Sequence, residues 1–133
     1  THGDFYEANL LVAGDRLSLI DLDASGPGLR EDDLACLLAH LAVLPRLSPR
    51  HYAAVPRVLA EWTADFAGRV RHPAALYARV AAVVLSLVAG GDDEQAAVRL
   101  DLAQEWTQRA REARAVSRGG SAGTVEGRAE EAT

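Results

Sequence analysis

The sequence predicts an α+β fold that is mainly helical. Two short apolar runs joined by a turn come first, and four apolar stripes with helical spacing follow. The change of period comes after DASGPGLRE, a loop rich in small residues at 23–31. At 133 residues the chain is long enough for one modest domain with a hydrophobic core.

The first part of the chain predicts a loop followed by a β-hairpin. LLV at 10–12 and LSLIDL at 17–22 are the two strands. Between them, AGDR supplies turn chemistry in Gly14 and Asp15. The hairpin therefore precedes every predicted helix.

Two apolar stripes predict helices in the middle of the chain. The first begins behind Asp32 and Asp33 as caps and ends at Pro45. The second opens at Ser48-Pro49, a cap residue followed by a proline at the first helical position. The apolar members are Leu34, Leu37, Leu38, Leu41 and Leu44 in the first stripe, and Val55, Leu59, Trp62, Phe66 and Val70 in the second.

Two more stripes predict helices from Pro73 to the Gly-Gly pair at 90–91, and from Asp92 onward. Gln95 follows Asp92 by three residues, which is the spacing of a capping box. The apolar members are Leu76, Val80, Val83, Val84 and Leu87 in the third stripe, and Val98, Leu102, Trp106 and Ala110 in the fourth. Trp62 and Trp106 lie on stripes, so both are expected in the core.

No apolar periodicity continues into SRGGSAGTVEGRAEEAT, residues 117–133. Small and charged residues of this kind bury too little apolar surface to order a chain. We expect a folded lobe over 1–116 and a disordered tail over 117–133.

Composition favours a soluble cytoplasmic protein without nucleic-acid or membrane partners. The net charge is -5, and no basic stripe is present to neutralise phosphates. Cys36 lies in the apolar run LACLLAHLAVL, which predicts a buried structural thiol in a reducing compartment. The apolar stretch LYARVAAVVLSLVAG contains Arg79 and is expected to be too short to span a bilayer.

The stretch HGDFYEAN carries a pattern that phosphoryl transfer requires. His2, Asp4 and Asn9 match the spacing H-x-D-x-x-x-x-N, in which the carboxylate orients an acceptor hydroxyl. Asp21, in LIDLD, ends the second apolar strand. An amide oxygen and a carboxylate are hard ligands suited to magnesium. The hairpin would fold Asn9 and Asp21 back beside each other.

Three segments within residues 1–38, HGDFYEANLLV, LSLIDLD and GPGLREDDLACLL, together resemble the C-terminal half of the aminoglycoside phosphotransferase/choline kinase-like family. That family has the protein-kinase-like fold. The resemblance implies that Asp4 is the catalytic base and that Asn9 and Asp21 hold Mg²⁺. It also implies that His2 braces the loop and that Asp33 hydrogen-bonds back to the loop backbone. The local alternative for Asp33 is a simple helix N-cap.

The implied activity is transfer of the γ-phosphate of ATP, or alternatively GTP, to a hydroxyl of a small molecule, for example an aminoglycoside-like substrate. The family's N-terminal nucleotide-binding lobe, with its strand lysine, has no counterpart in a chain that contains no lysine. We therefore expect a C-terminal lobe whose N-terminal lobe is missing and which is inactive alone. The acceptor pocket is expected between the loop and the helices after residue 45.

Three further carboxylates have two interpretations each. Asp23, two residues beyond Asp21, either supports the metal site or contacts substrate, or it is a solvated loop residue. Glu61 and Asp65, one helical turn apart, either attract a cationic substrate or lie on a solvated helix face, and the second is favoured. The net acidity of the chain mildly favours a cationic acceptor.

Two other functions are weighed against the phosphotransferase. A non-catalytic, pseudokinase-like binding or regulatory module would need none of the three residues Asp4, Asn9 and Asp21. A metal-dependent hydrolase using His2 and Asp4 as ligands would need further histidines or carboxylates at helical spacing, which the sequence lacks.

Overall fold

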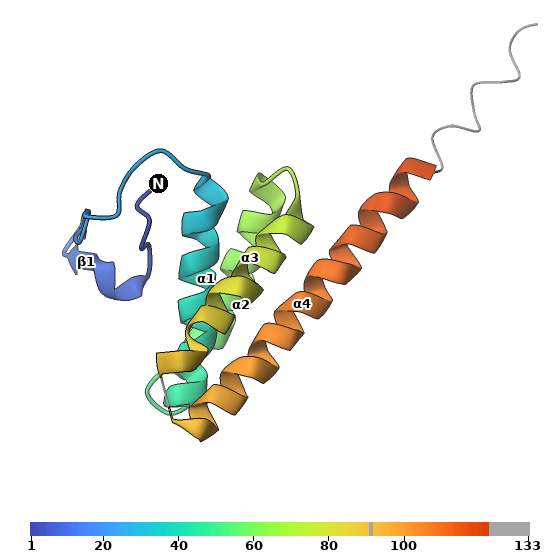
Figure 1. The fold of residues 1–133 in the computed structure, drawn as a ribbon. Coiled ribbons are helices and arrows are strands. Elements are labelled where there is room, and N and C mark those ends of the chain that lie inside the picture. The colour runs from blue at the N-terminus through green and yellow to red at the C-terminus, as the bar shows by residue number, and fades with distance from the viewer. Residues whose placement is uncertain (91, 123–133) are drawn as a thin grey trace, which may run out of the picture.

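The computed structural model describes residues 1–90 and 92–122, and the fold is mainly helical with one small antiparallel sheet (Figure 1). This confirms the α+β, mainly helical class. In the described residues the elements are η1 (Glu7–Asn9), β1 (Leu10–Ala13), β2 (Arg16–Leu19), α1 (Arg30–Leu47), α2 (Val55–Arg69), α3 (Pro73–Ser86), η2 (Val88–Gly90) and α4 (Asp93–Ala122).

The hydrophobic core lies where α3 packs against both α1 and α4. Leu38 from α1 and Leu76, Val80 and Val84 from α3 are fully buried. Trp106 of α4 is 2% exposed, so its predicted place in the core is confirmed. The helical stripes of the sequence meet here, because each helix turns one apolar face toward α3.

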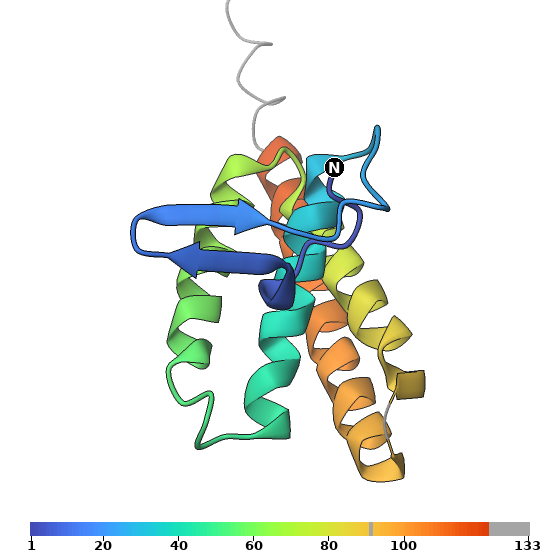
Figure 2. The same ribbon diagram turned by 90° about the vertical axis from the view of Figure 1, so that its left-hand side faces the viewer.

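The hairpin lies on the α1 side of the helices, away from α4 (Figures 1 and 2). Leu10 pairs with Leu19, and Ala13 pairs with Arg16 across the turn. The second strand is shorter than the predicted 17–22, since it ends at Leu19. Apolar side chains on the ribbon remain exposed: Leu11, Val12, Leu17, Leu19 and Ile20.

Helix α1 differs from its prediction at both ends. It begins at Arg30, with Asp32 and Asp33 in its first turn rather than before it. Neither aspartate caps the helix, because the Asp32 carboxylate binds Arg79 and the Asp33 carboxylate binds backbone N–H groups of residues 2 and 3. Pro45 lies inside the helix, in its last turn, so the Leu41 carbonyl receives no hydrogen bond from residue 45.

Helix α2 begins at Val55, so the predicted opening at Ser48-Pro49 is wrong. Residues 48–54 form turns instead, and Pro56 takes the early helical position that suits a proline. Trp62 is 39% exposed, so its predicted burial is also wrong. Trp62 lies on α2, and α2 makes fewer contacts with the other helices than α3 does.

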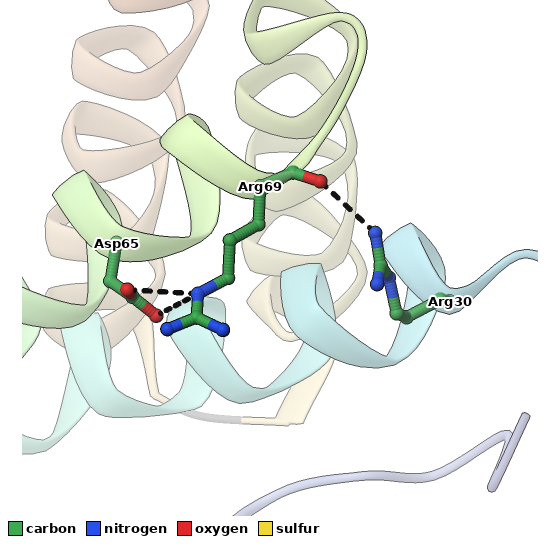
Figure 3. A network of polar contacts seen from close by, with 3 residues as sticks. All are labelled: Arg30, Asp65 and Arg69. Carbon is green, nitrogen blue, oxygen red and sulfur yellow. Dashed lines mark hydrogen bonds and ion pairs between the residues drawn. The ribbon is translucent and has the colours of Figure 1, made fainter.

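A polar network joins the end of α2 to the start of α1 (Figure 3). The Arg30 guanidinium donates to the backbone carbonyl of Arg69 at 3.1 Å, and the Arg69 Nε binds the Asp65 carboxylate at 2.8 Å. Glu61 likewise pairs with Arg57 at 2.9 Å. Both predicted carboxylates of α2 are thus paired on an exposed helix face, which is the interpretation that the sequence favours.

Helices α3 and α4 begin as predicted. Pro73 starts α3, and the Asp92 side chain accepts a hydrogen bond from the Gln95 N–H at 2.8 Å. Helix α4 continues to Ala122, past the predicted boundary at 117, although residues 117–122 include two glycines. Residues 123–133 of the predicted tail lie outside the described residues.

The segment Pro73–Gly90 is 18 residues long and, by length and composition alone, apolar enough to cross a membrane. It is longer than the apolar stretch singled out in the sequence. Leu76, Val80 and Val84 within it are fully buried against neighbouring helices. Of the whole segment, 22% is buried inside the structure.

Candidate functional site

Asp33 holds the start of the loop that contains the phosphotransfer-like motif, here named the HGD loop (His2–Asn9). One carboxylate oxygen accepts the His2 N–H at 2.7 Å, and the other accepts the Gly3 N–H at 2.9 Å. Hydrogen bonds to an ionised carboxylate are stronger than those between neutral groups. The structure thus places Asp33 in the contact expected for it, and α1 fixes the backbone of the loop.

The close approach of this loop to residue 24 requires a glycine at position 3. Gly3 has φ +87°, a left-handed conformation that other residues rarely adopt. A Cβ at this position would clash with the backbone carbonyl of Ala24. Gly3 therefore lets the loop turn tightly under the segment that follows the hairpin.

His2 connects the HGD loop to the end of the hairpin. Its side chain is 6% exposed, and its Nδ1 accepts the Asp4 N–H at 3.3 Å. With Nδ1 accepting, Nε2 carries the proton and donates to the Ile20 carbonyl at 2.9 Å. The imidazole is thus positioned as a brace inside the loop, with neither ring nitrogen left to bind a metal ion.

Asn9 and Asp21 lie at neighbouring points of the hairpin. The Asn9 carbonyl accepts the Ile20 N–H at 3.1 Å, which continues the ladder and leaves Asp21 one residue further along. The Asn9 side chain is buried, and its Nδ2 donates to the Asp4 carbonyl at 2.9 Å. Asp21 is exposed and has φ +59°, an uncommon conformation for a residue with a side chain.

The donor set at this point fits magnesium in its chemistry. Because Asn9 uses its Nδ2 toward the loop, its Oδ1 is the atom left for a ligand. The Asp21 carboxylate has no hydrogen-bond or ion-pair partner in the described part of the chain. Two protein oxygens leave room for phosphate and water oxygens, as Mg²⁺ prefers. Over 1–90 and 92–122, no three His, Cys, Asp or Glu side chains gather as a metal site.

Asp4 lines a pocket of ≈ 500 Å³, here named the Asp4 pocket, which lies between the HGD loop, α1 and the last turn of α3. Its volume is in the range of small-molecule sites. The carboxylate of Asp4 has no bonding partner in the described residues. The lining residues are Thr1, Gly3, Asp4, Pro27, Gly28, Asp32, Asp33, Cys36, His40, Val83, Ser86 and Leu87.

The sequence did not single out Cys36, His40 and Ser86 as pocket residues. Cys36 and His40 follow Asp33 by three and seven residues, so all three share one face of α1. That spacing was a usable signal for the first two. Ser86 comes from α3, and only the packing of α3 against α1 brings it to the pocket.

Burial keeps two titratable side chains of the pocket uncharged near neutral pH. Burial, with the nearby charges of Asp4 and Asp33, raises the pKa of the Cys36 thiol to about 11. Burial also lowers the pKa of His40, against the opposing effect of Glu7 and Asp4. The His40 ring stacks on Tyr6, with ring centroids 4.3 Å apart. Cys36 thus fits the predicted structural thiol rather than a nucleophile.

Asp23 is exposed, and no hydrogen bond or ion pair engages its side chain in the described residues. The turn that follows β2 is closed by backbone groups, with the Ser25 N–H donating to the Leu22 carbonyl at 2.9 Å. Neither interpretation of Asp23 gains support from these contacts, so its role stays a prediction.

No family model, curated protein or solved structure matches this chain. The resemblance to phosphotransferases therefore depends on the motifs within residues 1–38 and on the arrangement of the loop that they form.

Proposed function

We propose that this chain is the C-terminal lobe of an ATP-dependent small-molecule phosphotransferase, with GTP as the alternative donor. The observation that carries the proposal is the Asp33 contact to the HGD loop, at 2.7 and 2.9 Å, which fixes the backbone on either side of His2. The loop so held presents a carboxylate without a protein partner, that of Asp4, to a pocket of small-molecule size.

In this proposal Asp4 accepts a hydrogen bond from the acceptor hydroxyl and takes its proton as the phosphoryl group is transferred. His2 and Asn9 keep the Asp4 backbone in place through its N–H and its carbonyl, respectively. Asn9 Oδ1 and the Asp21 carboxylate would hold Mg²⁺. When bound, that ion neutralises charge on the phosphates of the nucleotide. Transfer to a hydroxyl then depends mainly on positioning.

The exposed hairpin supports the idea that a nucleotide-binding lobe completes the site. Leu11, Val12 and Leu17 are each at least 50% exposed, and a two-stranded ribbon is marginally stable without a partner. A covering lobe would bury this surface next to Asn9 and Asp21. Residues 1–133 alone are expected to be inactive, since phosphate positioning accounts for several kcal/mol of such barriers.

The first test is the coding sequence upstream of the Thr1 codon. An in-frame stretch of roughly 100 residues or more, with a glycine-containing hairpin and a strand lysine, supports the proposal. A stop codon directly before Thr1 contradicts it and favours the non-catalytic binding module.

The second test uses the two-lobe protein and three matched substitutions. Asp4→Asn should abolish transfer from ATP while leaving nucleotide binding intact. Asp21→Ala should weaken binding of the magnesium–nucleotide complex itself. Asp101→Asn, at an exposed position of α4 away from the hairpin, is the control and should leave both unchanged. Equal, mild effects of the first two substitutions would remove the basis for these roles.

A further inference from the structure

We propose that the acceptor bound in the Asp4 pocket is a hydroxyl compound with an apolar part and at most one positive charge. The inference rests on the proposed phosphotransferase function, and it differs from the cationic preference that the net charge of the chain suggests. Its basis is the charge of each side chain that lines the pocket and the partner that each one already binds.

Three carboxylates line the pocket, and two of them are engaged. Asp32 forms an ion pair with Arg79 of α3, with the Arg79 Nε at 2.7 Å from the carboxylate. Asp33 uses both oxygens to accept backbone N–H groups of the HGD loop. In the described part of the chain, Asp4 is therefore the lining carboxylate that remains free for a ligand, and the proposed mechanism assigns it to the acceptor hydroxyl.

Apart from the Thr1 ammonium group, which donates to the Gly26 carbonyl at 2.8 Å, the rest of the wall is uncharged. Val83 and Leu87 supply apolar surface from the last turn of α3, and Cys36 adds a protonated thiol from α1. Ser86 donates its hydroxyl proton to the Val83 carbonyl at 2.7 Å, so its oxygen can accept a hydrogen bond but not donate one. These groups suit a ligand with an apolar part and neutral polar groups.

A ligand with several ammonium groups would lose hydration in this pocket and would meet one carboxylate without a protein partner, that of Asp4. Burying an unpaired charge is costly, and the two engaged carboxylates already have their partners. Glu7 lies close enough to affect the pKa of both Cys36 and His40, yet it does not line the pocket.

The net negative charge of the whole chain does not determine which ligand binds in the Asp4 pocket. Glu61 and Asp65 lie on α2, paired with Arg57 and Arg69, and outside the Asp4 pocket. Exposed charges further away than about 8–10 Å are largely screened at physiological salt. Local charges, rather than the net charge of -5, decide which acceptor fits.

Amide NMR titration of the isotope-labelled chain with three cyclohexane compounds tests the inference. The probes are 1,4-cyclohexanedimethanol, which is neutral, 4-(aminomethyl)cyclohexanemethanol, with one ammonium group, and 2-deoxystreptamine, with two. We expect the first two to shift the His40, Ser86 and Leu87 amides in the millimolar range. We expect 2-deoxystreptamine to bind about tenfold more weakly.

A charge added to the pocket should reduce or remove this difference between the probes. Ser86→Asp introduces a second free carboxylate at an exposed position, where the fold tolerates it, and should strengthen 2-deoxystreptamine binding by about five- to tenfold. Ala78→Asp adds the same charge at an exposed position of α3 that lines a different groove. That control should leave the order of the three probes unchanged.

Failure of this inference and failure of the proposed function have different signatures. Tighter binding of 2-deoxystreptamine to the unmodified chain, or no shift at these amides with any probe, overturns the inference. If the probes bind in the predicted order but the two-lobe protein transfers no phosphoryl group, the ligand class is upheld and the proposed function is overturned. Transfer that prefers polycationic acceptors upholds the function and overturns the inference.

Discussion

Replacing Asp33 by Asn tests how α1 holds the HGD loop. The carboxylate accepts the His2 and Gly3 N–H groups at 2.7 and 2.9 Å with its two oxygens. An asparagine has one acceptor oxygen and an NH₂ group, so at least one backbone N–H loses its partner and the other loses an ionised acceptor. A hydrogen bond to a charged group contributes about 1.5–3 kcal/mol, which gives a local loss of about 2–4 kcal/mol.

The loss should be local, because the loop is attached to the helices mainly by polar contacts while the core lies between α1, α3 and α4. Amide hydrogen exchange measures it directly. The Asn9 and Ile20 amides, whose hydrogen bonds close η1 and extend the hairpin, should exchange roughly 30- to 1,000-fold faster, since about 1.4 kcal/mol corresponds to a factor of ten. The Leu38 and Val80 amides of the core should not change.

Asp32→Asn is the matched control, one residue away in the same first turn of α1. It removes the same charge from the helix terminus, so both variants lose the same interaction with the helix dipole. Its partner is the Arg79 side chain in a partly exposed ion pair, which contributes about 0–1 kcal/mol. Equal acceleration in the two variants, or faster exchange in the core of Asp33→Asn, would refute the role given to Asp33.

Three other predictions concern the core and the pocket. Leu38→Ala, at a fully buried position, should lower the free energy of urea unfolding by about 2–5 kcal/mol, whereas Leu85→Ala, at a 53% exposed position, should lower it by under about 1 kcal/mol. The rate of Cys36 alkylation in the folded chain should keep rising above pH 9 and level off near the thiol's pKa of about 11. In the urea-unfolded chain the rate should level off near the ordinary pKa of 9.0. Coincident rate profiles would contradict the burial of the thiol. Burial lowers the pKa of His40 in the folded chain below its ordinary value of 6.5. As the pH falls, the unfolded chain therefore binds the proton first, and the stabilisation present above pH 6.5 should be lost as the pH falls through the lowered pKa. His40→Gln should flatten this part of the urea-unfolding profile, and an unchanged profile would contradict the lowered pKa of His40.

The helices were predictable because local periodicity determines them, and so were the starts of α3 and α4, whereas the starts of α1 and α2 were not. Asp32 and Asp33 look like caps in the sequence, yet Arg79 and the HGD loop engage their carboxylates instead. Ser48-Pro49 has the local chemistry of a helix start, but the chain makes turns there and starts α2 at Val55. Competition between local and tertiary partners is invisible in a single periodic pattern.

Trp62 shows the same limit in packing. Its spacing with Leu59 and Phe66 correctly predicts a helix, but a stripe does not state how much of it another helix covers. Helix α3 has neighbours on two sides, and its stripe is buried; α2 packs mainly on α1, and Trp62 remains 39% exposed.

The candidate site was predictable where it is local and was missed where it depends on helix packing. His2, Asp4 and Asn9 stand at fixed spacing, and the hairpin brings Asp21 to the same end as Asn9. The opposite wall of the pocket comes from Ser86 and its neighbours in α3, which meet the loop only because α3 packs on α1. No spacing in the sequence encodes that contact.

Both walls of the Asp4 pocket are held by polar side chains from elsewhere in the chain. Asp33 fixes the loop wall, and the buried Arg99 of α4 donates to the carbonyl of Leu87, at the end of the α3 wall. Gln95, one turn earlier in α4, binds the same guanidinium at 3.2 Å. Apolar burial assembles the helices, while these directional contacts attach each wall to a neighbouring helix. The pocket can therefore be loosened without unfolding the core, and this is why the Asp33 substitution should change exchange in the loop alone.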